Sequence, residues 1–332
     1  MSNHNLIRNK NLELLKVFLF QQQQAFKAEM SKETGISVVT INSLVKQLVD
    51  ENVLLEGELM KQALGRPAIR YHFNYDQAHY LLLSIQEKKV AEQRKLILVG
   101  KIVNLAGTEK YQKTIDFAPV SLAFLMDTIQ QFLALEFPIE RIGLSFPGKV
   151  YNGTVLSSWE NLFDGWQIEA ALAQRTSLPI IIQNDAHLLT VGYAIRQRLM
   201  AEQTLVGIFY PESSMPGITI VSNGTLIEGG RNLAGEAKFL PHLLQSPAPK
   251  TAAELVNNLL EILAIYNAVI APDAFVLSAE SAPQPMILEA VEQSSLLAKQ
   301  LNKPKIFFVD PFQDSLTYGL RWLAMRDTIY TL

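Results

Sequence analysis

A run of short polar and basic side chains between residues 37 and 47 is suited to hydrogen bonding with nucleic acid. In the segment ISVVTINSLVKQLVDENVL, the apolar residues recur at helical intervals and predict one buried side, made of Val38, Ile41, Leu44, Val45 and Leu48. The other side carries hydroxyl, amide and ammonium groups, and we predict that it binds DNA through Ser37, Thr40, Asn42, Ser43 and Lys46. Because these side chains are short or seek phosphate, phosphate contacts are expected to outweigh direct base readout.

Three helices are expected to position these side chains. Residues 11–20 have helical apolar spacing, and the four glutamines at 21–24 are interpreted as a helix end and a solvated turn. Residues 26–35 predict a short helix that Gly35 ends, Ser37 is a suitable N-cap for the next helix, and Asn52 suits a left-handed cap after it. Two short helices separated by a glycine turn are typical of a helix-turn-helix, whose second helix enters the major groove of DNA.

The segment that follows predicts a wing. Residues 53–74 alternate apolar and polar side chains around the sequence Gly-Arg-Pro, which is typical of two paired strands with Arg66 at the tip. We therefore add Arg66 to the predicted DNA-binding residues. The alternative is a surface hairpin whose arginine has no special role.

Composition narrows the classes of function. The chain has 332 residues, no cysteine and five scattered histidines, so we expect neither disulfides nor a metal site. Residues 1–75 carry nine Lys/Arg against seven Asp/Glu and the remainder twenty against twenty-five, a weak positive bias that permits DNA binding. We find no signal sequence and no apolar run as long as a bilayer span, and expect a cytoplasmic protein without a membrane partner.

From Tyr80 onward, short apolar strands alternate with helices. The strand-like segments YLLLSI and KLILVGKIVNLAG precede a helix at SLAFLMDTIQQFLALEF and a further strand at IERIGLSFPG. This alternation predicts an α/β domain after the winged helix. The C-terminal DSLTYGLRWLAMRDTIY predicts a helix that closes a lobe.

Several motifs in this α/β region resemble the ROK family, which groups sugar-responsive repressors with sugar kinases. The resemblance rests on IGLSFPGKVYNGTVLSSWENLFDGW, LPIIIQNDAHLLTVGYA and NGTLIEGGRNLAGEAKF, and extends to GRPA in the wing and NAVIAPDAFVLSAE near the end. It implies a two-lobed actin-like ATPase fold with a sugar cleft between the lobes. We expect a winged helix-turn-helix at 1–78, a first lobe at 79–190 and a second lobe at 191–332, with the C-terminal helix able to pack back on the first lobe.

The resemblance also implies a set of sugar-binding residues, namely Asn161, Asn184, Asp185 and Glu236. In an active kinase of this family, Asp185 would stand where the base accepts the proton of the attacking sugar hydroxyl. A carboxylate can equally accept two hydroxyl hydrogen bonds without chemistry, as a sensor requires. A second interpretation is that Asn184 and Asp185 cap a helix beginning at Ala186, and both can hold together.

The phosphate-binding motifs of the family are altered. The first glycine loop is replaced by SIQEKK at 84–89 and the second by PESSMPG at 211–217, where Glu87 and Glu212 have the wrong charge and Pro211 and Pro216 lack an N–H. LSAES at 277–281 stands where a glycine pair usually meets the nucleotide. We therefore expect no nucleotide cofactor and no catalytic residue, Asp185 being a vestigial base.

The family's zinc motif is also absent. Lys238 and Phe239 replace its Gly-His pair, the cysteine-rich segment is replaced by QSPAPKTAAEL, and His242 stands alone. Because the missing histidine also touches the sugar in the family, Phe239 either narrows the specificity, stacks on an altered ligand or marks a dead site.

These expectations combine into a repressor of carbohydrate-utilisation genes. It would form a homodimer or a dimer of dimers, bind operator DNA, and sense a sugar or sugar phosphate in a kinase-like cleft that is catalytically inactive. Two alternatives stay open: an active ROK carbohydrate kinase, and a ligand-independent DNA-binding or dimerisation protein.

Overall fold

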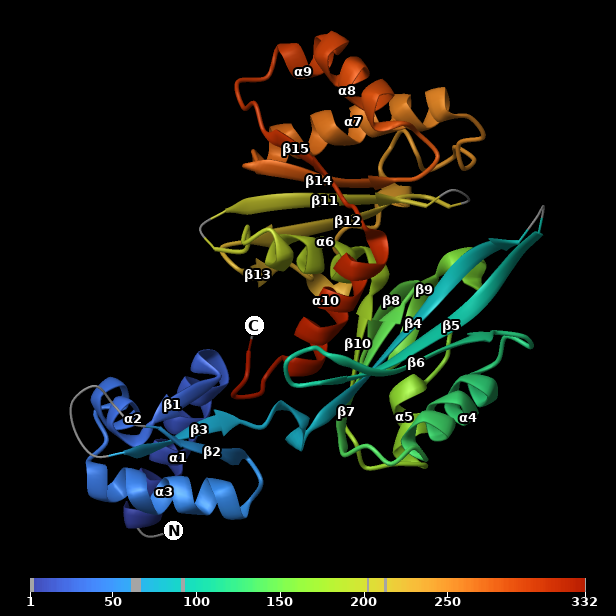
Figure 1. Cartoon of the computed structure of the whole chain (residues 1–332). Helices are drawn as coiled ribbons and strands as arrows, with labels where there is room; N and C mark the ends of the chain where they lie inside the picture. Colours follow the sequence, from blue (N-terminus) through green and yellow to red (C-terminus); the bar gives the residue numbers. More distant parts are fainter. Residues whose placement is uncertain (1–2, 61–66, 91–92, 202, 212–213, 332) are drawn as a thin grey trace.

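The computed structural model describes residues 3–60, 67–90, 93–201, 203–211 and 214–331 of the chain. Its elements form three groups (Figure 1): an N-terminal group of helices with a small sheet, and two larger sheets with their helices. Short 3-10 turns at Tyr75–Gln77, Trp159–Asn161, Gly230–Asn232 and Ala237–Phe239 join some of these elements.

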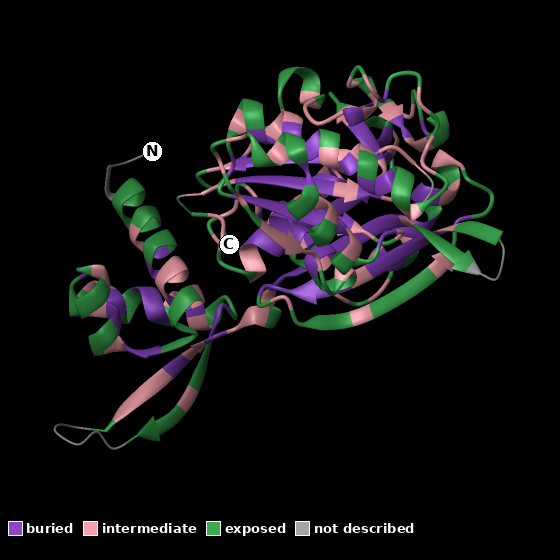
Figure 2. Cartoon of the chain, turned by 90° about the horizontal axis from the view of Figure 1, so that it is seen from above, coloured by how far each residue is buried: buried purple, intermediate pink, exposed green. Residues whose placement is uncertain are grey.

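The N-terminal group is a winged helix-turn-helix. It contains α1 (Asn3–Gln22), α2 (Lys27–Thr34), α3 (Val38–Asp50) and a sheet in the order β1-β3-β2, made of Gln24–Phe26, Ala68–Phe73 and Leu54–Met60. As expected, Gly35 ends α2 in the left-handed region with a φ of 71°. Figure 2 shows the β2–β3 hairpin extending away from the other two groups.

Two local expectations at the N-terminus were wrong. The first helix begins eight residues earlier than expected, in a part where Arg8 donates to the Gln47 side chain of α3 at 2.7 Å, and it includes Gln21 and Gln22, since glutamine is a good helix former. Only Gln23, with a φ of 66°, forms the turn, and β1 follows it because Gln24, Ala25 and Phe26 pair with β3.

The third helix is amphipathic and is capped as expected. Ile41, Leu44, Val45 and Leu48 are buried, and the Ser37 hydroxyl accepts a hydrogen bond from the Thr40 N–H at 3.2 Å. The expectation that Val38 is buried was wrong, since Val38 is 55% exposed. It lies at the first helical position, one turn before the buried stretch that begins at Ile41.

The first of the larger sheets has the order β10-β7-β4-β5-β6. Its strands are Ile180–Asn184, Ile139–Phe146, His79–Val90, Gln93–Asn104 and Glu109–Asp116 in that order, with β4, β5 and β6 antiparallel and β7 and β10 parallel to β4. Helices α4 (Leu122–Leu133) and α5 (Ile168–Ala173) pack on it around a core that includes Phe132 and Phe146. A hairpin of β8 (Gly148–Tyr151) and β9 (Thr154–Ser158) follows β7.

The second of the larger sheets has the order β13-β12-β11-β14-β15. Its strands are Thr225–Leu226, Gly217–Ser222, Thr204–Tyr210, Ala274–Ala279 and Lys305–Phe308 in that order. Helices α7 (Ala252–Ile270), α8 (Gln284–Gln293) and α9 (Ser295–Ala298) lie on one side of it, and α6 (Asp185–Arg196) and α10 (Phe312–Met325) on the other (Figure 1).

Helix α7 corrects the expectation that no apolar run reaches the length of a bilayer span. Among the described helices it alone is long and apolar enough to cross a membrane. Leu255, Leu259, Ile262 and Leu263 of this helix are nevertheless buried in the core of the second sheet. That burial is typical of a core helix in a folded domain.

Helix α10 joins the three groups. It packs along α6 and contacts β4, β7 and β10 of the first sheet. The two helices approach so closely that a Cβ on Gly192 would lie 1.8 Å from the Ser315 carbonyl oxygen, and one on Gly319 would lie 2.0 Å from that of Leu188. Glycine is therefore required at both crossing positions.

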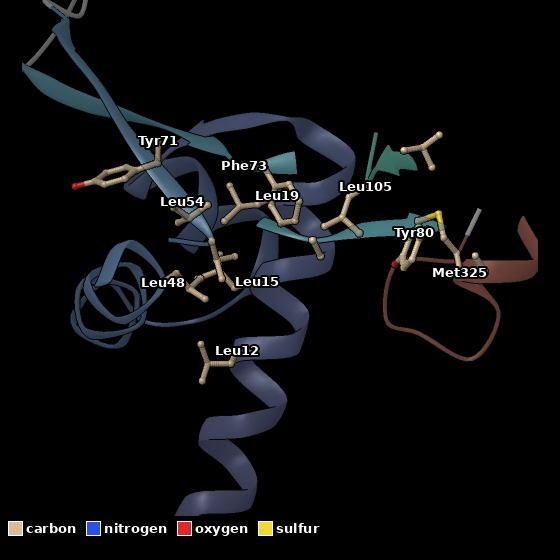
Figure 3. Close-up of a cluster of buried hydrophobic side chains, with 14 of the residues drawn as sticks. Leu12, Leu15, Leu19, Leu48, Leu54, Tyr71, Phe73, Tyr80, Leu105 and Met325 are labelled. Carbon is tan, nitrogen blue, oxygen red and sulfur yellow. The ribbon is translucent and has the colours of Figure 1, made fainter. Parts of the chain in front are cut away.

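The C-terminal segment after α10 contacts the winged helix. Tyr330 has its ring centroid 5.0 Å from that of Phe20 and 5.6 Å from that of Phe73. Figure 3 shows Leu19 and Phe73 of the winged helix in one apolar cluster with Leu105 and with Met325 at the end of α10. One continuous core therefore connects the N-terminal group with α10. The three groups support the division 1–78, 79–190 and 191–332, which we keep as a proposal.

Candidate functional site

A cavity of about 430 Å³ lies where elements of the two larger sheets meet. The four residues expected to bind a sugar, Asn161, Asn184, Asp185 and Glu236, all line it. They come from separate places in the chain: the turn after β9, the end of β10, the start of α6, and the loop after β13. Ser157, Trp159, Lys238 and Met215 share the lining.

Asn184 and Asp185 also cap α6. The Asn184 side-chain oxygen accepts a hydrogen bond from the Ala186 N–H at 3.1 Å, and the Asp185 carboxylate accepts from the same N–H at 2.8 Å. The Asn184 amide nitrogen donates to the Gly148 carbonyl oxygen at 3.2 Å. The two interpretations of these residues are thus compatible, because the capping residues also line the cavity.

The Asp185 carboxyl group has an unusual environment. Burial raises its pKa from 3.8 to about 6, although the Ala186 N–H and the positive charge of Lys149 both favour the ionised form. At neutral pH Asp185 is still ionised and can accept hydrogen bonds from ligand hydroxyl groups.

Glu236 is held in the cavity by a cation and a hydroxyl. The Lys238 ammonium lies 3.4 Å from the Glu236 carboxylate and donates to the Ser157 hydroxyl at 2.6 Å, and Ser157 donates to Glu236 at 3.4 Å. Gly235 precedes Glu236 with a φ of 85°, and a Cβ there would lie 1.9 Å from the Ile218 carbonyl oxygen. A glycine is needed to bring Glu236 to the cavity.

Phe239 does not line the cavity, although its ring centroid lies 5.4 Å from the Lys238 ammonium nitrogen. Its side chain is 63% exposed. Of the two residues that replace the family's Gly-His pair, Lys238 is the one at the cavity, where it adds a positive charge beside Glu236. His242 lies 3.6 Å from Glu261, and no metal-binding group of His, Cys, Asp and Glu occurs among the described residues.

The sequence reasoning missed a buried network of hydrogen-bonded polar side chains next to the cavity. The Lys149 ammonium, 3% exposed, donates to His187 Nε2 at 2.9 Å and to the Ala234 carbonyl oxygen at 2.9 Å. His187 Nδ1 lies 3.0 Å from the Gln183 side-chain oxygen, and the Gln183 amide donates to Glu228 at 2.7 Å. The lysine within the apolar run IGLSFPGKVY was a signal that could have revealed it.

The surroundings of His187 and Lys149 determine the protonation of this buried network. Burial, together with the positive charge of Lys149, lowers the pKa of His187 to about 3, so the imidazole is neutral and accepts from Lys149. Burial also lowers the pKa of Lys149 to about 8, against the opposing effect of Glu236, Asp185 and Glu228. Lys149 therefore remains mostly charged at neutral pH and balances the carboxylates of the cavity.

The segments expected to replace the phosphate loops also reach the cavity. Residues 84–89 form no loop, because β4 pairs continuously with β5 as far as Val90 opposite Gln93. Glu87, Pro211 and Pro216 line the cavity, whereas Glu212 lies outside the described residues. In the third altered segment, LSAES at 277–281, the first three residues complete β14 and the last two follow it.

The predicted DNA-binding residues fall into three groups. Asn42, Ser43 and Lys46 are exposed on α3. Ser37 and Thr40 are engaged with each other, their hydroxyl oxygens 2.9 Å apart. Arg66 lies outside the described residues. Val39, which the sequence reasoning did not single out, is 81% exposed on the same helix.

Part of the chain is similar to a known family. The family model described as the ROK family matches residues 95–244, a range that includes all four expected sugar-binding residues. These residues are therefore similar to a ROK family domain. A "Xylose repressor" of Bacillus spizizenii is 19% identical over 249 residues, which are 71% of this chain and 61% of that protein. This chain spans about 60% of the length of the curated relatives it matches.

Solved structures confirm the fold. The crystal structure of a ROK family transcriptional regulator, a homologue of the E. coli MLC protein, has a TM-score of 0.66 and 15% identity, covering 98% of this chain and 97% of that one. A ROK family glucokinase from Streptomyces griseus, in complex with glucose and AMPPNP, has a TM-score of 0.53 and 15% identity, covering 74% of this chain and 99% of that one. The first match includes the winged helix, and the second leaves about a quarter of this chain unmatched.

Proposed function

We propose that the chain is a DNA-binding transcriptional repressor of carbohydrate-utilisation genes that senses a sugar or sugar phosphate and has no kinase activity. One observation carries the proposal: a winged helix with an exposed polar face is joined, through a continuous core, to a ROK domain in which Asn161, Asn184, Asp185 and Glu236 meet at one cavity. The relatives named xylose repressor support it and suggest xylose as the first sugar to test.

The cavity has the chemistry that a sugar requires. Asp185 and Glu236 accept hydrogen bonds from hydroxyl groups, Asn161 and Asn184 can both donate and accept, and Lys238 donates. Trp159 offers an aromatic face for the apolar side of a pyranose ring. A volume of about 430 Å³ lies within the usual range of small-molecule sites, roughly 300–1,000 Å³.

The same cavity is poorly suited to a nucleotide. A phosphate nest needs successive backbone N–H groups that converge on an anion, whereas residues 84–90 form an extended strand paired with β5. Pro211 and Pro216, which line the cavity, have no N–H to donate. These features support a binding role for Asp185 in place of proton abstraction.

The route from the cavity to DNA runs through two helices. Helix α6 begins at Asp185 and packs tightly on α10, whose C-terminal extension places Tyr330 against Phe20 and Phe73 of the winged helix. A ligand that shifts α6 would therefore bias the position of the winged helix. Useful regulation needs a differential affinity of about 1–3 kcal/mol between the two arrangements.

Assembly and location complete the proposal. A homodimer, or a dimer of such dimers, would place two α3 helices on half-sites about one helical turn of DNA apart. Binding to operator DNA also requires that the chain act in the cytoplasm.

The test is selection of duplexes from a random-sequence library with the purified full chain, followed by measurement of binding to the enriched duplex over a series of salt concentrations. A repressor should enrich one sequence and bind it more tightly than scrambled DNA at every salt concentration. Failure to enrich any sequence would overturn the DNA-binding proposal.

A parallel assay addresses the kinase alternative. ADP release from ATP should be absent with xylose, glucose and other hexoses, whereas turnover that disappears in Asp185→Asn would establish an active kinase. If DNA binds but no sugar raises the melting temperature of the chain, the ligand-independent alternative holds.

A further inference from the structure

Val39 occupies a position on α3 that none of the predicted DNA-binding residues fills. It is 81% exposed, against 55% for Val38, and it lies in the first turn of the helix. Asn42, Ser43 and Lys46 follow it at intervals of three, four and seven residues, so the four side chains form one line along the exposed face. Val39 is the apolar member of that line and stands at its N-terminal end.

The polar residues on either side of Val39 are engaged. The Ser37 hydroxyl accepts from the Thr40 N–H at 3.2 Å and lies 2.9 Å from the Thr40 hydroxyl oxygen, so both groups contribute to the N-cap. Neither hydroxyl is then free to leave the cap without a cost to the helix. At the start of α3, the side chain that projects farthest into solvent is therefore a branched hydrocarbon.

We infer that Val39 reads the 5-methyl group of a thymine in the major groove, an inference that rests on the proposed DNA-binding function. In a helix-turn-helix, the N-terminal residues of the second helix contact base edges, and in the major groove the thymine methyl is the apolar group that an aliphatic side chain can recognise. Asn42, one turn further on, has the amide that pairs with adenine N6 and N7. Together they select an A·T-containing half-site, in which base reading contributes beside the phosphate contacts of Lys46.

The composition of α3 supports a functional role for Val39. An exposed valine in a helix has a lower helix propensity than alanine or the straight-chain residues, and no core contact offsets this, because the buried stretch of α3 begins at Ile41. Val39→Ala should consequently fold as well as the original chain. Val269→Ala is a matched control, since Val269 is 73% exposed on α7, a helix that packs on the second of the larger sheets.

The experiment uses the duplex enriched from the random library and a set of copies in which one thymidine at a time is replaced by deoxyuridine. This replacement removes one methyl group and keeps the base pair. For the original chain and for Val269→Ala, uracil at one thymine of each half-site should weaken binding about fourfold, as expected for one methyl group removed from an apolar contact. Val39→Ala should bind the thymine duplex at least about fourfold more weakly and no longer distinguish thymine from uracil at that position.

The outcomes separate this inference from the proposed function. An enriched duplex that Val39→Ala binds as tightly as the original chain does, or a thymine preference that survives in Val39→Ala, would overturn the role of Val39 and leave the repressor proposal intact. If no duplex is enriched, the DNA-binding function itself fails. Circular dichroism of each variant identifies any loss of binding that comes from unfolding.

Discussion

Replacing Asp185 with asparagine should stabilise the unliganded protein at neutral pH. Burial raises the pKa of the Asp185 carboxyl group from 3.8 to about 6, so folding holds the ionised form in an unfavourable environment. The difference of about 2 pH units, at about 1.4 kcal/mol each, corresponds to about 3 kcal/mol of lost stability at pH 7.5. Asparagine carries no charge and can still accept the Ala186 N–H that caps α6.

The sign of the pH dependence follows from proton binding. Between pH 3.8 and about 6 the folded state binds more protons at Asp185 than the unfolded state, so the stability of the original chain falls as pH rises through this window. The cost is fully present above pH 6 and disappears below pH 3.8. The melting temperature of Asp185→Asn should therefore exceed that of the original chain by several degrees at pH 7.5, and this excess should shrink towards pH 5.

Differential scanning calorimetry over pH 5 to 8 measures this difference. Asp116→Asn is the control, because Asp116 is exposed at the end of β6. A melting temperature of Asp185→Asn at or below that of the original chain at pH 7.5 would refute the reasoning, since it would mean that the buried carboxylate is stabilised by its surroundings. A stabilised variant that no longer responds to sugar would show that Asp185 is kept for binding at the expense of stability.

Three further predictions concern the scaffold. Gly319→Ala should lower the melting temperature by an amount corresponding to about 1–3 kcal/mol, because its Cβ would lie 2.0 Å from the Leu188 carbonyl oxygen; Gly230→Ala, where the space is open, should not. Leu44→Ala should cost about 2–5 kcal/mol in the winged helix and abolish DNA binding in a mobility-shift assay, while sugar binding measured by calorimetry is retained. Tyr330→Ala should leave sugar affinity unchanged and reduce the effect of sugar on DNA affinity measured by fluorescence anisotropy, and an unchanged effect would exclude this route of coupling.

The amphipathic pattern of residues 38–50 and the glycine at 35 were sufficient to predict the helix-turn-helix, because both reflect local rules of helix formation. Hydrophobic periodicity could not predict that Val38 and Val39 are exposed, since it does not reveal where along a helix the contact with the core begins. Local patterns also could not predict β1, because it pairs with a strand that lies more than forty residues away in the chain.

The cavity residues could be brought together only through the motifs of the ROK family. Asn161 and Glu236 are 75 positions apart, and no local pattern places them at one site. Adjacent residues can also differ in their relation to the cavity: Lys238 lines it, whereas Phe239 is exposed. Lys149 on β8 and His187 on α6 are 38 positions apart in the sequence, and no local pattern predicts their contact.

The affinity of the chain for its enriched duplex, measured with and without each of a panel of sugars and sugar phosphates beginning with xylose, tests the central claim most directly. We predict that one of them changes the DNA affinity of the original chain at least about fivefold and has no effect on Asp185→Asn. A DNA affinity that no sugar changes, or a response that Asp185→Asn retains in full, would contradict the claim that this cavity controls the winged helix.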